Sequence, residues 1–399
     1  MEKPRRAVSV PRSYWVDDHL VAGAHPGALD GAEAEEKVRA LVEAGLPQAD
    51  DTGDRVLGCL LAGAIGDALG NPLEFETLET IRRLNPLPAP HLVTDDTQMT
   101  LFTAEGLIRA VDGDDRLTRV TDVLGHAYLR WLHTQGQPWS AIRSGSDPST
   151  IPDEPDGWLV KERWLHHRRA PGNTCLCALM TGSFGTIEAP LNDSKGCGGV
   201  MRAAPAGFFA DDVEHAFSIG AHTAAITHGH PSGYWSAGAL AAMVHALLGG
   251  ADLPVAVDAG RALTANAPKG AETADAIGMA VALAENGVPS SEDLESLGGG
   301  WVGEEALAIA VACALSADEI GDEAALTLAV THSGDSDSTG SICGNLLGAI
   351  HGTGGLPATW VNSVEGGDTI RRLAADCATA RIDGLDRSQP EVRTRYPTG

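Results

Sequence analysis

Residues 56–69 read VLGCLLAGAIGDAL, and this run carries the clearest structural signal in the chain. Apolar residues fill almost every position, with Gly58, Gly63 and Gly66 among them. A helix that is apolar all round is buried, and its glycines allow neighbouring helices to approach closely. We therefore predict a central core helix, in which the charged side chain of Asp67 must find a partner.

Similar runs, rich in Ala, Leu and Gly, continue along the chain, and only 5% of the 399 residues are aromatic. This composition favours short, closely packed helices over strands. Further helices are predicted over residues 97–111, 119–134, 175–181, 213–227, 233–248, 255–265, 271–286, 304–316, 323–332, 341–350 and 370–380. The proline-rich segment 136–172 is predicted to be a long irregular loop. The expected fold class is all-α.

The charge balance limits the partners of the protein. With 54 acidic and 28 basic residues the formal net charge is −26, which repels nucleic acid and anionic lipid. An anionic ligand would therefore need a bound cation, helix N-termini or oriented backbone amides. The seven cysteines form no paired framework, and no apolar stretch reaches the roughly 18 residues of a membrane span. We expect a cytoplasmic protein with reduced thiols, no membrane partner and, by default, a monomeric state.

The first residues differ in character from the rest. The stretches 11–15 (PRSYW) and 20–27 (LVAGAHPG), followed by a predicted helix over 33–44, resemble the opening of dual-specificity phosphatase-like domains. Such enzymes need a Cys nucleophile with an Arg six positions later, and none of the seven cysteines has one. The acidic run 50–54 is predicted to be a linker. We expect residues 1–51 to be a non-catalytic appendage and residues 52–399 to be the main domain.

Two clusters of hard oxygen ligands precede apolar helices. The first is Thr94-Asp95-Asp96-Thr97 and the second is 332-HSGDSDSTG-340. Either cluster can be a simple helix cap, because Thr and Asp satisfy free amides at a helix start. The second lacks the Glu that completes an EF-hand calcium loop about twelve residues after its first Asp. Taken together, two matching carboxylate and hydroxyl clusters predict one shared Mg²⁺ or Mn²⁺ site.

These clusters resemble the metal signature of the ADP-ribosylglycohydrolases, which include arginine-specific hydrolases and dinitrogenase reductase-activating glycohydrolases. Four further motifs agree in order and spacing, over about residues 55 to 352: 58-GCLLAGAIGDALG-70, 169-RAPGNT-174, 194-SKGCGGVMR-202 and 227-THGHPSGY-234. The resemblance implies a compact orthogonal bundle of helices with a central cleft that holds two Mg²⁺ or Mn²⁺ ions. The form of the second cluster looks closest to the arginine-specific branch.

The resemblance also implies roles for particular residues. Ser338 stands where many relatives have Thr, and either hydroxyl can coordinate a cation. The implied metal ligands are Thr94, Asp95, Asp96, Asp335, Asp337 and Ser338. The implied catalytic carboxylates are Asp96 and Glu74, and the implied substrate contacts are Ser194, Lys195, Gly196, Cys197, Gly198, His228, Ser333 and Gly334.

Simpler interpretations of several of these residues stay open at this stage. Glu74 can be an ordinary exposed acid after a turn, and the glycines of 194–198 can form a tight turn. His228 and His230 can serve in capping or packing. Zinc held by these histidines with Cys175 and Cys177 fits no usual ligand spacing. Asp67 can either be a structural hydrogen-bonding residue or orient metal ligands.

The expected reaction is metal-dependent hydrolysis of the C1″ glycosidic bond of an ADP-ribose conjugate, with ADP-ribosyl-arginine on a protein as the first candidate. A hydrolase for ADP-ribosyl-serine, for O-acetyl-ADP-ribose or for a free nucleotide derivative is an alternative on the same scaffold. A catalytically silent ADP-ribose-binding module is an alternative of another class.

Overall fold

The computed structural model describes residues 49–84, 87, 89–111, 116–146, 151–382 and 385–397. The phosphatase-like stretches and the helix predicted over residues 33–44 lie outside these ranges. In chain order the helices are α2 (Ala49–Gly70), α3 (Leu78–Arg83), α4 (Asp95–Ala110), α5 (Arg116–Thr134), α6 (Trp139–Gly145), η2 (Leu159–Lys161), η3 (Arg163–His166), α7 (Asn173–Met180), η4 (Cys197–Gly199), η5 (Ala204–Phe208), α8 (Val213–Ala225), α9 (Pro231–Leu248), α10 (Leu253–Asn266), α11 (Ala271–Glu285), α12 (Ser291–Glu295), α13 (Gly303–Leu315), α14 (Ala317–Ile320), α15 (Asp322–Ala329), α16 (Ser336–His351), α17 (Ala358–Ser363), α18 (Gly367–Ile382) and α19 (Pro390–Arg395).

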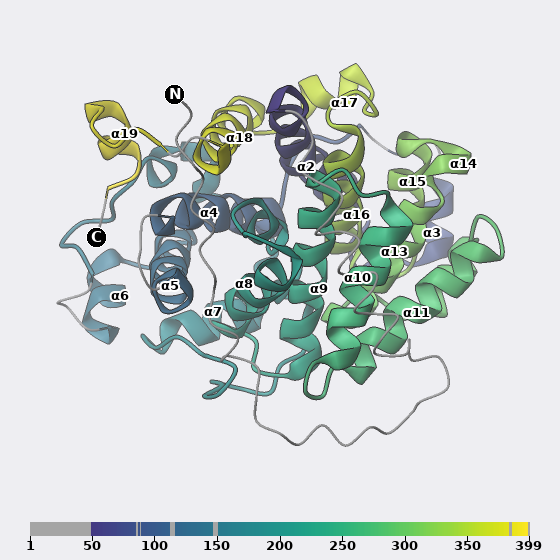
Figure 1. Ribbon diagram of the computed structural model, residues 1–399, viewed down its shortest axis with the longest axis horizontal. Coiled ribbons are helices and arrows are strands. Elements are labelled where there is room, and N and C mark those ends of the chain that lie inside the picture. The colour runs from purple at the N-terminus through teal and green to yellow at the C-terminus, as the bar shows by residue number, and fades with distance from the viewer. Residues whose placement is uncertain are drawn as a thin grey trace, which may run out of the picture.

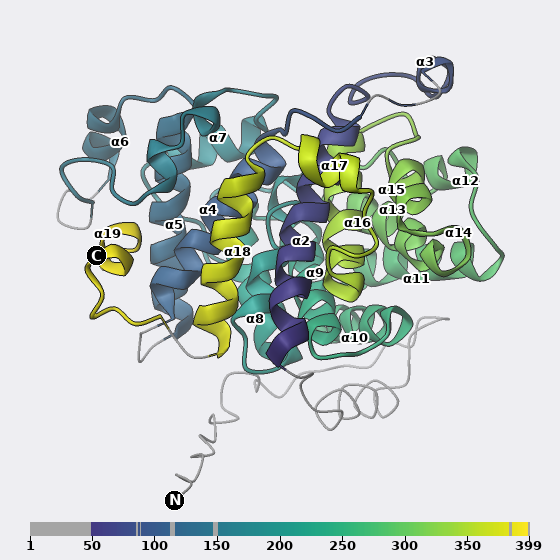
Figure 2. The same cartoon turned by 90° about the horizontal axis from the view of Figure 1, so that it is seen from above.

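The helices form two layers (Figure 1). Figure 2 shows α18, α2 and α16 side by side, with α4 and α5 beyond α18 and with α13 and α15 beyond α16. Helices α8, α9 and α10 make up most of the second layer, beneath this row. Within the described ranges there is no β-strand, and a single isolated bridge joins Gly196 to Val302. The predicted all-α class is confirmed.

The predicted core helix α2 is buried against α16, and glycines line their contact. A Cβ atom added to Gly66 would lie 2.0 Å from the carbonyl oxygen of Gly340, and one added to Gly348 would lie 2.1 Å from that of Gly58. Contacts that run in opposite directions along the two chains make the helices antiparallel. Asn345 of α16 also donates a hydrogen bond of 2.8 Å to the Cys59 carbonyl. The two backbones therefore touch, which the larger side chains of an ordinary helix pair would prevent.

Every predicted helix within the described ranges is present, and most begin one to five residues earlier than expected. Helix α4 starts at Asp95 rather than at residue 97, and α16 starts at Ser336 rather than at residue 341. Thr94 and Asp335 cap these helices, since their side chains accept hydrogen bonds from the first-turn amides. Acidic residues are favoured in such first turns by the helix dipole. The acidic clusters are therefore helix starts and not only loops.

Two sequence-based predictions about irregular segments were wrong. Residues 50–54, which were predicted to be a linker, belong to α2. Segment 136–172 contains α6 and the 3₁₀ helices η2 and η3 between its prolines. Prolines interrupt helices but tolerate single turns between them, so the loop is divided rather than unstructured.

A buried ion cluster fixes this segment to the core. Glu105 accepts hydrogen bonds from Arg109 at 2.8 Å and from Arg130 at 2.7 Å, and Arg109 also binds Asp156 at 3.0 Å. Because Asp156 belongs to the long segment and the other three residues belong to α4 and α5, the segment is held against these helices. None of the described helices is long and apolar enough to cross a bilayer.

Candidate active site

Helix α2 brings the starts of α4 and α16 together through Asp67 and Gly70. The Asp67 carboxylate is fully buried and accepts hydrogen bonds from the Thr94 amide at 2.9 and 3.0 Å, the Thr94 hydroxyl at 2.9 Å and the Thr97 amide at 3.0 Å. On the other side, a Cβ atom on Gly70 would lie 2.3 Å from the Ser336 carbonyl oxygen. Asp67 thus has structural partners, and those partners are the residues that start α4.

The four other carboxylates of the two clusters are buried as well. The exposed fractions of Asp95, Asp96, Asp335 and Asp337 lie between 2% and 5%. Burial, and next the charge of Asp337, raise the pKa values of Asp95, Asp96 and Asp335 well above their usual range. The same two causes raise the pKa of Asp67 to about 7. Because these charges act on one another across the two clusters, α4 and α16 present one continuous acidic site.

The individual oxygen atoms differ in what they bind. The Asp335 carboxylate accepts a hydrogen bond of 2.8 Å from the Cys197 thiol, and Asp95 accepts one of 3.3 Å from the Gly172 amide. Asp96 Oδ1 is buried with no hydrogen-bond partner. Within the described part of the chain, no three His, Cys, Asp or Glu side chains are arranged as a formed metal site. The structure thus brings the predicted ligands together without showing a coordination geometry.

Glu74 lies beside this acidic site, in the connection from α2 to α3. It is half-buried, and burial followed by the charges of Asp337 and Asp67 raises its pKa to about 8. Both ends of the connection are attached to the clusters. The Asn71 side-chain amide donates to the Leu92 carbonyl, just before the first cluster, at 2.8 Å, and the Leu78 backbone amide donates to the Ser333 hydroxyl at 2.8 Å. Glu74 is therefore not the ordinary exposed acid that the sequence left open.

The glycine-rich loop 194–198 lies against His228. Cβ atoms added to Gly196 and Gly198 would each lie 3.4 Å from His228 Nε2. Thr227 Oγ1 accepts from Arg202 at 2.7 Å and lies 2.8 Å from His228 Nδ1 and 3.5 Å from the Ala224 carbonyl oxygen. Burial, and next the Arg202 charge, lower the His228 pKa to about 3. His228 is thus a neutral ring whose Nε2 faces the loop.

The other predicted substrate residues have structural partners in the protein. The Lys195 ammonium pairs with Glu272 at 2.7 Å and with Glu304 at 2.5 Å, and these bonds raise its pKa. The two acids shift in opposite directions. Hydrogen bonds from Lys195 and Ser232 lower the Glu272 pKa, whereas burial raises that of Glu304. The positive charge of Lys195, a residue of this loop, is therefore already balanced by the two glutamates.

Ser333 and Gly334 connect the second cluster to its surroundings. The Ser333 amide donates to Glu295 at 2.9 Å. Gly334 has φ +142°, and a Cβ atom there would lie 2.0 Å from the Gly299 carbonyl oxygen, so the position requires glycine. His230 accepts from the Ser232 amide at 3.2 Å as the cap of α9, which explains that histidine without zinc.

Comparison with known proteins identifies the family to which this fold and site belong. The model of the ADP-ribosylglycohydrolase family matches residues 48–386. The chain belongs to this family. The ADP-ribosylarginine hydrolase Tri1 of Pseudomonas putida (strain GB-1) is 26% identical over 345 residues, which cover 84% of this chain and 81% of the relative. A solved structure described as an ADP-ribosylglycohydrolase-related protein complex is 24% identical and covers 84% of this chain and 100% of its own, with a TM-score of 0.55. The protein is a glycosidic-bond hydrolase, and its fold is that of the family.

For this ADP-ribosylglycohydrolase, the site residues are chemically suited to a divalent cation. The acidic site offers carboxylate and hydroxyl oxygens, which hard cations such as Mg²⁺ prefer. The carboxylates of the acidic site repel one another, which raises their pKa values, and one buried Asp96 oxygen has no partner. A cation bound among them would relieve the repulsion and give that oxygen a partner. The family is generally metal-dependent, in agreement with this arrangement.

Several residues that shape the glycohydrolase site were missed in the sequence. Cys197 was assigned to the substrate loop, and its bond to Asp335 was not foreseen. Arg169 donates to the Val93 carbonyl at 2.7 Å and forms an ion pair with Glu365, so it fixes the residues before the first cluster. A conspicuous family motif around Arg169 was the only signal for this role.

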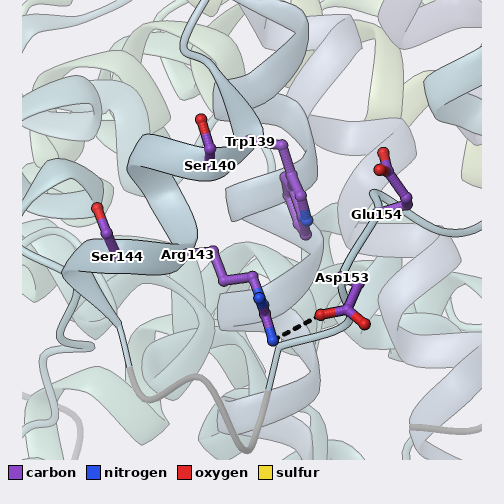
Figure 3. A pocket seen from close by; sticks show the side chains of 6 residues that line it. All are labelled: Trp139, Ser140, Arg143, Ser144, Asp153 and Glu154. Atoms are coloured by element: carbon purple, nitrogen blue, oxygen red, sulfur yellow. Dashed lines mark ion pairs between the residues drawn. The ribbon is translucent and has the colours of Figure 1, made fainter.

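A separate pocket lies outside the site of the glycohydrolase (Figure 3). It is lined by residues of α6 and of the segment after it: Trp139, Ser140, Arg143, Ser144, Asp153 and Glu154. Arg143 pairs with Asp153 at 2.7 Å, as the dashed line shows. This pocket contains none of the predicted catalytic, metal or substrate residues.

Proposed function

We propose that this glycohydrolase cleaves the C1″ bond between ADP-ribose and an arginine side chain of a protein, with two Mg²⁺ or Mn²⁺ ions as cofactors. The observation that carries the proposal is the buried acidic site between the starts of α4 and α16, with the unpartnered Asp96 oxygen in it. The name of the relative Tri1, an ADP-ribosylarginine hydrolase, supports the choice of arginine. The proposed ligands are Thr94, Asp95, Asp96, Asp335, Asp337 and Ser338.

Divalent cations supply positive charge that can hold ribose hydroxyls and lower the pKa of a water molecule. The protein residues then have distinct tasks. Glu74 lies half-buried beside the acidic site. It would take up a proton from the attacking water once bound cations lower its pKa from about 8, because a carboxyl group with that pKa is mostly protonated at neutral pH. Asp96 is the alternative base, because one of its oxygens has no protein partner. An oxocarbenium-like transition state at C1″ is favoured by the same negative surroundings.

The proposed substrate contacts place ADP-ribose along the loop 194–198 and residues 333–334. The glycines of the loop let backbone amides approach a diphosphate closely. His228 adds the Nε2 atom of a neutral ring, which costs less to bury than a charged imidazolium. Lys195 contributes position rather than free charge, because its ammonium is already paired with two glutamates.

The leaving group favours an acidic protein. A guanidine departs as a cation, and an acidic protein with a net charge of −26 can offer that cation a nearby carboxylate more readily than a basic protein can. We also propose that residues 1–51 are an appendage without a part in the chemistry, since all residues assigned to the site lie after residue 70.

The test measures release of ADP-ribose from an arginine-ADP-ribosylated protein with Mg²⁺, with a chelator, and with Asp335→Ala and Asp337→Ala combined. We expect release that needs both metal and the two carboxylates. Asp275→Ala, which removes an exposed acid on α11, is the matched control and should keep full activity. Release from ADP-ribosyl-serine, O-acetyl-ADP-ribose or a free nucleotide derivative alone would move the assignment to another acceptor. Binding of ADP-ribose without any cleavage would replace the enzyme by a binding module.

A further inference from the structure

Two aromatic side chains lie exposed and stacked beside the acidic site. Phe75 is 70% exposed and Trp301 is 42% exposed, and their ring centroids are 5.2 Å apart at an interplanar angle of 24°. Large apolar side chains in such positions gain little from folding. Their stacking therefore calls for an explanation outside core stability.

Backbone contacts place the pair at the edge of the site from two sides. Phe75 follows Glu74 directly, in the connection that is attached at Leu92 and Ser333. Trp301 accepts a hydrogen bond of 3.1 Å on its carbonyl from the Cys197 amide of the substrate loop. Phe75 thus belongs to the connection that carries the candidate base Glu74. Trp301 belongs to the segment whose backbone is bonded to the candidate diphosphate-binding loop.

The backbone of Phe75 is strained. Its φ of +69° lies in the left-handed region, which is unfavourable for residues other than glycine. Such conformations persist where the surroundings fix them, and they gather at ligand-binding positions. A glycine would remove the strain but would also remove the ring, so the position combines a strained backbone with an exposed aromatic side chain.

Each ring has an acidic residue close to it along the chain. Glu74 is next to Phe75, Glu305 accepts a hydrogen bond of 3.0 Å from the Gly299 amide, and a Cβ atom on Gly299 would lie 2.9 Å from the Trp301 ring. Aromatic faces with nearby acids attract planar cations, and a guanidinium stacks on such faces. The chemistry of the edge favours a cation over a nucleotide base.

We propose that Phe75 and Trp301 form the acceptor subsite of this hydrolase, in which the guanidinium of the ADP-ribosylated arginine stacks on their rings. This inference rests on the proposed arginine specificity and adds the residues that would confer it. Neither ring takes part in bond cleavage, so the subsite affects binding of the acceptor and not the chemical step.

The test compares wild type, Trp301→Ala and Trp301→Phe as full-length, metal-loaded proteins. For Trp301→Ala we expect the KM for ADP-ribosyl-arginine to rise about twofold to thirtyfold, the range of a cation–π contact. The Kd for free ADP-ribose, measured by calorimetry, should change less than twofold. Trp301→Phe keeps a ring and should restore most of the affinity. Ile382→Ala, at an exposed apolar residue that ends α18, is the control and should change neither value.

Different failures have different meanings. An unchanged KM in Trp301→Ala refutes the subsite. A Kd for ADP-ribose that weakens in parallel with KM shows that the rings hold the nucleotide, and this also refutes it. If the wild type binds ADP-ribose but does not cleave the arginine conjugate, the arginine specificity itself is wrong and the subsite falls with it. Thermal unfolding of each variant separates these results from loss of the fold.

Discussion

Replacing Gly344 by Ala tests whether the contact between α2 and α16 controls the stability of the domain. A Cβ atom at Gly344 would lie 2.1 Å from the Ala62 carbonyl oxygen, whereas ordinary contact begins at 3.4 Å, so the atoms must separate by the difference of about 1.3 Å. The obstacle is backbone of a buried helix rather than the end of a flexible side chain. The two helices must therefore move apart or tilt along their whole contact.

The expected change in the free energy of unfolding follows from two opposing effects. In a free helix, Ala is more favourable than Gly by about 1 kcal/mol. Inserting a methyl group into a closely packed core costs about 1–3 kcal/mol, and more where the backbone must shift. The overlap at Gly344 is with backbone, so we expect the upper part of this range and a net loss of about 1–2 kcal/mol.

Gly53 provides a matched control within α2. A Cβ atom there would meet nothing within 4 Å, so Gly53→Ala keeps the gain in helix propensity without the overlap. Urea unfolding followed by circular dichroism should therefore shift its midpoint upward for Gly53→Ala and downward for Gly344→Ala. Two upward shifts would refute the backbone contact on which this account of the fold depends.

Three further outcomes can be checked by unfolding and titration. In chelator at pH 8, Asp96→Asn should raise stability by about 1 kcal/mol or more, since it removes a buried repelling acid. The same variant should lack the increase in Tm that we expect Mn²⁺ to cause in the wild type. Burial lowers the His245 pKa to about 4, so the unfolded chain takes up a proton at this residue first, and the contribution of His245 to stability falls between pH 6.5 and 4 by up to about 3 kcal/mol. His245→Gln should flatten that part of the curve, and an unchanged slope contradicts this. Phe75→Gly should leave Tm unchanged or slightly higher, because the backbone strain is relieved and the lost ring is exposed. The KM for the arginine conjugate should rise. A marked fall in Tm would contradict this reasoning.

The sequence predicts the helices well because their signal is local. The apolar run 56–69 marks a buried helix whatever surrounds it, and the structure buries almost all of it. Helix starts were placed too late at residues 97 and 341, because acidic first turns resemble loops when read by apolar periodicity alone. Short helices such as α6 and α12 have too few residues to show a period, which is why they were missed.

The candidate site could be predicted as a set of residues but not as a geometry. Asp95 and Asp337 are far apart in the sequence, and only the likeness of their two clusters and the family motifs suggested that they meet. The stacking of Phe75 on Trp301 and the bond from Cys197 to Asp335 depend on how loops from different helices approach one another. No spacing or periodicity encodes such contacts. The roles in catalysis and metal binding remain predictions, supported by the positions of these residues.

The glycine contacts and the acidic site depend on each other physically. Asp67 on α2 holds the start of α4 through Thr94, and Gly70 on the same helix sets how closely the start of α16 approaches. The distance between the carboxylates of α4 and α16 is therefore set by helix packing rather than by the loops that precede these helices. Repulsion among these acids opposes that packing. The close glycine contacts between α2 and α16 must therefore outweigh the repulsion. Gly344→Ala, which relaxes the packing, should consequently weaken Mn²⁺ affinity at a position remote from the carboxylates, while Gly53→Ala should not.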